Sequence, residues 1–224
     1  MDDCFTSANR QFDGVSDFAG PAGYTWKSRG YLPHFDGPEL TQHITMHLGD
    51  SLPVDIVKRL DDELQMLPRE KQDIARRKRV DAWLDAAHGS CILRDPAAAM
   101  IVQEALFFFD GVRYQLSGWV VMPNHVHVLF TPKSGWAMAK TIWSWKKYTA
   151  ARIVDYLRAK DNSLADNERF WHREYWDRFM RDERHFAQTM EYIHHNPVKA
   201  RLVARAEEWR WSSAWTGRNA VQEA

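Results

Sequence analysis

Two histidines separated by a single residue are the groups in this sequence best suited to chemistry. They are His125 and His127, in the run WVVMPNHVHVLF that spans residues 119–130. In an extended strand, side chains at positions i and i+2 project from the same face, so we expect both imidazoles to point the same way. Two parallel imidazoles make half of a divalent-metal site, which a carboxylate or amide oxygen would complete. The alternative is a pair of half-buried strand histidines that make hydrogen bonds.

A second set of reactive groups lies in the segment EYIHHNPVKA, residues 191–200. On a helix, positions i and i+4 share a face, so Tyr192 and Asn196 should project together. A phenol beside a metal-binding amide could act as a covalent nucleophile. Because the reference pKa of a phenol is about 10, a nearby cation or base would be needed to activate it. The alternative is a core tyrosine followed by an asparagine helix cap.

Other residues could compete for these roles. His195 lies three positions after Tyr192 and could approach the same face as a rival ligand or a proton shuttle, whereas His194 and His195 could instead serve packing or DNA contact. Three further tyrosines lie between the two motifs, and none has an amide side chain four positions later. We therefore expect core or base-stacking roles for them: Tyr148, Tyr156 and Tyr175.

The elements that position these groups follow from hydrophobic periodicity and from helix and turn signals. Their order suits an α+β domain, an antiparallel sheet with helices packed on one face. His43 and His47 lie four apart on the first strand and should share a face, as core or edge histidines. The predicted strands are 40–48, 114–121, 125–131 and 176–180, and the predicted helices are 54–67, 70–87, 96–109, 137–160 and 182–196, the last one stopped by Pro197.

The composition is that of a folded chain with a neutral overall charge. It has 224 residues, 45% of them hydrophobic, and 30 basic residues balance 30 acidic ones, which excludes a uniformly basic nucleic-acid binder. Cys4 and Cys91 are too few for a disulfide framework or a cysteine zinc site. With a polar N-terminus and no long apolar span, we expect a cytoplasmic protein that does not contact a membrane.

Positive charge is nevertheless concentrated in two stretches. Residues 133–160 carry a net charge of +6, with tryptophans and a tyrosine between the basic side chains, and residues 69–79 carry +4. Lysines could neutralise phosphates while aromatic rings stack on unpaired bases. The alternative for the first stretch is an amphipathic helix whose tryptophans lie in the core. The candidate DNA contacts there are Lys140, Trp143, Lys146, Lys147 and Arg152, with Arg76–Arg79 as a weaker candidate.

Taken together, MPNHVH at residues 122–127 and YIHHNPVKA at residues 192–200 resemble the REP-associated tyrosine transposases. These belong to the single-tyrosine HUH transposase family, in which two histidines flank a hydrophobic residue. Residues 170–171, 175–181 and 209–213 also look like that family, so the resemblance extends from about residue 40 to residue 215.

The resemblance implies a ferredoxin-like antiparallel sheet with the histidines on a central strand. It also implies cleavage of single-stranded DNA beside a palindromic, REP-like hairpin through a covalent 5′-phosphotyrosine, with Mg²⁺ or Mn²⁺ as cofactor and a location at the nucleoid. By this resemblance His125, His127 and Asn196 are metal ligands, Tyr192 is the nucleophile, and Lys199 in the second motif is a candidate DNA contact. A hairpin-binding protein without catalysis and a metal hydrolase that uses water are the rival functions.

We expect three parts in the chain. Residues 1–37 are predicted to be a loosely ordered arm, residues 38–215 the nuclease domain with a helical insertion at about 53–95, and residues 216–224 a tail. Both a monomer and a homodimer are consistent with the sequence.

Overall fold

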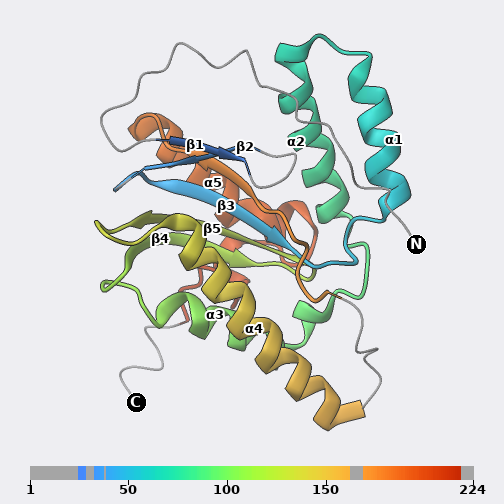
Figure 1. Ribbon diagram of the computed structural model, residues 1–224. Helices are drawn as coiled ribbons and strands as arrows, with labels where there is room; N and C mark the ends of the chain where they lie inside the picture. Colours follow the sequence, from blue (N-terminus) through green and yellow to red (C-terminus); the bar gives the residue numbers. More distant parts are fainter. Residues whose placement is uncertain (1–24, 29–32, 38, 162–168, 218–224) are drawn as a thin grey trace, which may run out of the picture.

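A four-stranded antiparallel sheet forms the centre of the protein. The structure is a computed structural model that describes residues 25–28, 33–37, 39–161 and 169–217 (Figure 1). The sheet has the strand order β4-β5-β3-β6. Its strands are β3 (Gln42–His47), β4 (Tyr114–Val121), β5 (His125–Pro132) and β6 (Trp176–Phe179).

The two histidines lie on a central strand because β5 is paired on both sides. It pairs with β4 and with β3, in a register that places His125 opposite His47 and His127 opposite Thr45. Seven of its eight residues are buried, as expected for a strand rich in β-branched and aromatic side chains. Alternation along the strand sends Val126, Val128 and Phe130 to one face and the histidines to the other.

Two crossover helices cover the face of the sheet opposite the histidines. Helix α3 (Pro96–Phe107) connects β3 to β4 and α4 (Met138–Asp161) connects β5 to β6. They enclose the main hydrophobic core with Val126, Val128 and Phe130. Asp95 caps α3 by accepting a hydrogen bond of 2.8 Å from the Ala97 amide, as its position before Pro96 predicts. This βαββαβ order and strand arrangement confirm the α+β, ferredoxin-like class.

Helix α5 (Glu183–Lys199) lies on the other face, which differs from the prediction that the helices share one side (Figure 1). The histidine face also carries apolar side chains, Val120 and Leu129, and Ile193 of α5 buries them. The helix also continues past Pro197 to Lys199. Proline lacks an amide proton and usually ends a helix. Here it lies in the last turn, where its carbonyl accepts a hydrogen bond of 2.9 Å from the Leu202 amide.

The predicted insertion is a pair of helices beside the β6 edge of the sheet. Helices α1 (Val54–Gln65) and α2 (Arg69–Asp85) are separated at Pro68 and share a small core of their own. Trp176 of β6 packs against this core, which holds the insertion next to the sheet. The core residues are Leu52, Leu60, Leu64, Val80 and Leu84.

The arm predicted at 1–37 contains ordered structure in its second half. Strands β1 (Thr25–Ser28) and β2 (Pro33–Asp36) form a two-stranded antiparallel sheet. Such short strands lack the sustained alternation from which a strand can be recognised in sequence. The rest of that arm, residues 1–24, lies outside the described residues, as does most of the predicted tail. The domain boundaries stay a prediction.

A segment near the C-terminus covers the free edge of β4. The Val121 amide donates to the Trp211 carbonyl at 2.8 Å, and the Ser213 amide donates to the Trp119 carbonyl at 2.9 Å. Pairing of this kind leaves the edge strand without exposed backbone donors. No helix among the described residues is long and apolar enough to cross a membrane.

Candidate active site

The two histidines form a buried pair on the face of β5 that α5 covers. His125 and His127 are each 1% exposed, with ring centroids 4.8 Å apart and planes at 82°. Within the part of the chain that the structure describes, both Nε2 atoms are buried and have no hydrogen-bond partner. A buried polar atom without a partner is costly, so two such atoms side by side point to a ligand that would satisfy them.

The other ring nitrogen of each histidine is held by a neighbour. His125 Nδ1 lies 2.7 Å from Asn124 Oδ1, an acceptor, so Nδ1 carries the proton and Nε2 keeps its lone pair. His127 Nδ1 lies 2.9 Å from Thr45 Oγ1 and 3.2 Å from His43 Nε2. Contacts of this kind orient metal-binding imidazoles and set their tautomers.

Both imidazoles are uncharged at neutral pH. Burial, with a smaller contribution from the positive charge of Lys199, lowers the pKa of His125 to about 3. Burial also lowers the pKa of His127 well below its usual value, with smaller contributions from His125 and His43. Neutral imidazole is the form that binds a metal, so both histidines are ready ligands without loss of a proton.

Helix α5 brings Tyr192 and Asn196 over this pair, as their spacing predicts. Its N-terminus is fixed by Asp182, which accepts a hydrogen bond of 2.7 Å from the His185 amide. The Tyr192 ring meets the His127 ring edge to face, with centroids 5.3 Å apart. Asn196 is 1% exposed, and neither its side-chain atoms nor the Tyr192 hydroxyl has a hydrogen-bond partner among the described residues.

The Tyr192 phenol is held in its protonated form. Burial raises its pKa most, and the negative charges of Asp81 and Asp85 raise it further, whereas Asn196 acts in the opposite direction. A phenol in this state is a poor nucleophile until a base or a cation assists it.

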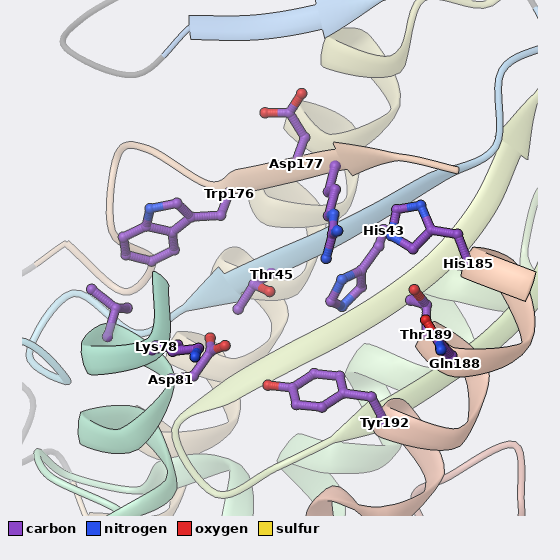
Figure 2. Close-up of a pocket in the computed structure, with 12 residues that line it drawn as sticks. His43, Thr45, Lys78, Asp81, Trp176, Asp177, His185, Gln188, Thr189 and Tyr192 are labelled. Carbon is purple, nitrogen blue, oxygen red and sulfur yellow. The ribbon is translucent and has the colours of Figure 1, made fainter. Parts of the chain in front are cut away.

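The phenol opens onto a pocket of about 440 Å³ between α2, β3, β6 and α5 (Figure 2). His43 and Thr45 form its floor on β3, Asp81 lies on α2, and Tyr192 closes it from α5. The pocket therefore gives a substrate access to Tyr192, which lies next to the histidine pair.

These groups fit a divalent cation. The two Nε2 atoms and the Asn196 side-chain atoms are buried without a hydrogen-bond partner among the described residues, and Asn196 lies on the helix that covers the histidine face. The described residues include no cluster of three or more histidine, cysteine or carboxylate side chains poised for a metal. A cation here would therefore take the amide oxygen and water or substrate as its remaining ligands.

The same region of the chain matches a known protein family. Residues 105–196, which contain β4, β5, α4, the histidine motif, Tyr192 and Asn196, match the family model described as "Transposase IS200 like". Over this part of its length the chain is similar to the IS200-like transposases.

Individual relatives show the same similarity. The chain is 27% identical over 96 residues to a candidate REP-associated tyrosine transposase of Haemophilus influenzae, and 24% identical over 100 residues to the REP-associated tyrosine transposase of Escherichia coli K12. These alignments cover 42% and 45% of the chain and 54% of each relative, so the matching part spans about half the length of either relative.

A solved structure shares the fold. A REP-associated tyrosine transposase bound to a REP hairpin superposes with a TM-score of 0.54, at 16% identity and with 87% of each chain covered. At this identity the likeness concerns the fold, and it agrees with the arrangement of the sheet and helices described above.

The residues that could compete for the catalytic and metal-binding roles lie elsewhere. His194 is hydrogen-bonded to Ser213 Oγ at 2.8 Å and so fastens the C-terminal segment to α5. His195 is exposed and lines a separate pocket beside Ala206. Tyr148 is 51% exposed on α4, and the Tyr156 hydroxyl is bound to Asp95. The described structure thus brings neither of the two histidines nor these tyrosines to the pocket.

Three residues of the site were not singled out from the sequence. Asp81 and Asp85 approach Tyr192 from α2. His47, opposite His125, is fully buried, with Nδ1 at 2.7 Å from Ser51 Oγ and Nε2 without a partner among the described residues. The spacing of His47 from His43 predicted that the two share a face, but not that His47 lies at the site. The aspartates could not be recognised from the sequence, because α2 reaches the site only through tertiary packing.

The predicted DNA contacts divide into two groups. Most lie exposed on α4, on the opposite side of the sheet from the histidines, where the Lys147 ammonium lies 4.7 Å from the Trp143 ring centroid. Lys199 lies at the site, 2.6 Å from Asp85 and 6.0 Å from the centroid of the Tyr192 ring. The exposed α4 residues are Lys140, Trp143, Lys147 and Arg152.

Lys146 differs from its neighbours because its ammonium is bound within the fold. Its Nζ donates to the carbonyls of His172, Arg173 and Glu174 at 3.0, 3.3 and 3.1 Å. Burial lowers its pKa to about 8, against the opposing charge of Glu174. These bonds fix the segment that leads into β6.

Replacing Lys146 by alanine should destabilise the protein by about 2 kcal/mol, because the hydrogen bonds from its charged ammonium to three backbone carbonyls are lost. Urea denaturation followed by circular dichroism measures this change. Lys147→Ala is the matched control and should leave stability within about 0.5 kcal/mol of wild type, since that side chain is exposed. Equal stability of the two variants would contradict the role given to Lys146.

Replacing Asn124 by alanine should weaken Mn²⁺ binding by about 10–100-fold, because it removes the acceptor that orients the His125 ring. Isothermal titration calorimetry with Mn²⁺ measures the affinity, and circular dichroism checks the fold. Asn124 is fully buried and also donates to the His88 carbonyl at 2.9 Å, so some loss of stability should accompany the effect. Unchanged Mn²⁺ affinity in a folded variant would contradict the assignment.

Proposed function

We propose that the protein is a metal-dependent single-strand DNA endonuclease and strand transferase that works through a covalent 5′-phosphotyrosine. The observation that carries this proposal is the convergence of a phenol, two imidazoles and an amide whose buried polar atoms have no partner in the described part of the chain. Unsatisfied atoms in such density are characteristic of a site that a ligand completes. The similarity of residues 105–196 to the IS200-like transposases supports the same reaction class.

In this proposal His125, His127 and Asn196 would hold the cation and Tyr192 is the nucleophile. A bound Mg²⁺ or Mn²⁺ would polarise the scissile phosphate and stabilise charge on the leaving 3′ oxygen. Two imidazole ligands suit Mn²⁺ at least as well as Mg²⁺, which prefers oxygen ligands. The Tyr192 oxygen attacks the phosphorus, the bond to the 3′ oxygen breaks, and attack by another 3′-hydroxyl would rejoin strands without a nucleotide cofactor.

Single-stranded DNA beside a hairpin is the substrate we propose. The names of the relatives support it, since one is a REP-associated tyrosine transposase and the similar structure is of such a transposase bound to a REP hairpin. The exposed side chains of α4 would bind the DNA backbone and unpaired bases on the far side of the sheet. Lys199 would lie next to the reacting phosphate, given its place beside Tyr192.

The proposal is tested with a fluorescent oligonucleotide that copies a palindrome flanking the gene and has single-stranded tails. Incubation with Mn²⁺ should give a slowly migrating covalent band on a denaturing gel, and excess EDTA should abolish it. Hairpin binding that is tight and salt-sensitive, with no covalent band from any flanking palindrome, would instead support a non-catalytic binding protein. Cleavage without a covalent band would support a water-using hydrolase.

A further inference from the structure

The helical insertion contributes a carboxylate to the candidate active site. Asp81 of α2 and Tyr192 of α5 line the same pocket, and Figure 2 shows the carboxylate and the phenol oxygen directed toward each other across it. The two residues come from elements more than a hundred positions apart in the chain. Packing of Val80 and Leu84 in the insertion core fixes the helix that carries Asp81.

We propose that Asp81 is the general base that accepts the proton of Tyr192 during strand cleavage. This inference depends on the proposed function, because it concerns the same covalent step. It adds a residue that neither motif contains and gives the insertion a direct part in the chemistry.

Two other titratable groups near the phenol have roles of their own. Asp85, one turn further along α2, lies 2.6 Å from the Lys199 ammonium, which neutralises it. His43 Nε2 lies 3.2 Å from His127 Nδ1 and so helps to orient a proposed metal ligand. The remaining charged or titratable side chains around the pocket are Lys78 on α2, Asp177 and Arg178 on β6, and His185 on α5.

The proton and bond changes balance with Asp81 in this role. As the Tyr192 oxygen bonds to phosphorus, its proton passes to the Asp81 carboxylate and from there to solvent. The phosphorus–oxygen bond on the 3′ side breaks at the same time, and the leaving 3′ oxygen takes a proton from water. No oxidant, reductant or further reactant is required.

The environment of the phenol explains why an acceptor is needed. Burial and the two nearby aspartates raise the pKa of Tyr192, so hydroxide at neutral pH deprotonates it poorly. A carboxylate that comes within reach of the proton removes it only as the new bond forms, which is how a general base typically accelerates a reaction by about 10²–10⁴-fold.

The test is a single-turnover measurement of covalent adduct formation by wild type and Asp81→Asn with Mn²⁺ and the hairpin oligonucleotide. Asparagine has the same size but is not basic, so the rate should fall about 100-fold or more while hairpin affinity stays unchanged. Asp62→Asn is the matched control, because Asp62 is an exposed carboxylate on the neighbouring helix α1 and should leave the rate unchanged. Asp81→Glu should recover part of the lost rate.

The pH profile separates a base from a merely structural residue. In Asp81→Asn the proton must pass to hydroxide, so the rate of adduct formation should rise about tenfold per pH unit between about pH 6 and 9. The wild-type rate should change little over this range. An Asp81→Asn variant that matches wild type in rate and profile overturns the inference, and so does a slower variant with the wild-type profile. Absence of an adduct in wild type would instead overturn the proposed function.

Discussion

Replacing Tyr192 by phenylalanine should abolish the covalent protein–DNA adduct and reduce strand cleavage to below about 10⁻³ of the wild-type rate. Phenylalanine retains the ring that packs against His127 and Ile193 but lacks the oxygen that attacks phosphorus. The lost hydroxyl makes no hydrogen bond within the described residues, so stability should not fall and could increase slightly. Denaturing gels measure the adduct, and hairpin affinity from fluorescence anisotropy should equal that of wild type.

Tyr148→Phe serves as the matched control, because Tyr148 is half exposed on α4 and lies on the opposite face of the sheet. It should form the adduct at the wild-type rate. An adduct that persists in Tyr192→Phe would show that another residue is the nucleophile, and the assignment of the pocket would then be wrong.

Replacing His127 by alanine should lower adduct formation by about 10³-fold at moderate Mn²⁺ concentration and should weaken Mn²⁺ binding until calorimetry no longer detects it. The imidazole is fully buried and its Nε2 has no partner among the described residues, so its loss removes one of the two imidazole donors of the proposed site. His125→Ala should have a similar effect. High Mn²⁺ concentration should restore part of the activity if the residual ligands still bind.

His195→Ala is the control for this experiment, since His195 is exposed and lines a separate pocket. It should keep both Mn²⁺ affinity and adduct formation. Circular dichroism and hairpin binding confirm that each variant is folded, because truncating His127 leaves a cavity in the interior. Folded His125→Ala and His127→Ala variants with wild-type Mn²⁺ affinity would contradict the metal site.

The elements that carry the two motifs could be predicted because local periodicity fixes them. Alternation on β5 places His125 and His127 on one face whatever the partner strands are, and the helical repeat places Tyr192 above Asn196. Periodicity alone could not predict that the two elements lie together. That prediction rested on the resemblance of the paired motifs to a known family.

What the sequence did not reveal depends on tertiary contacts. Nothing local distinguishes Asp81 from the other charged residues of α2, and only packing of the insertion against Trp176 brings it to Tyr192. Lys146 sits in a basic stretch, yet its place on the helix turns it toward three backbone carbonyls. Helix α5 covers the histidine face because apolar residues such as Leu129 lie there too, and this also depends on tertiary contacts.

The most direct test of the account is to locate the DNA in the covalent adduct. Wild-type protein would react with Mn²⁺ and the hairpin oligonucleotide, nuclease and trypsin would then trim the adduct, and mass spectrometry would map the attached nucleotide. The account predicts a 5′-linked nucleotide on the peptide that contains Tyr192, at that residue alone. Attachment at Tyr148, Tyr156 or Tyr175, or to a residue other than tyrosine, would contradict it.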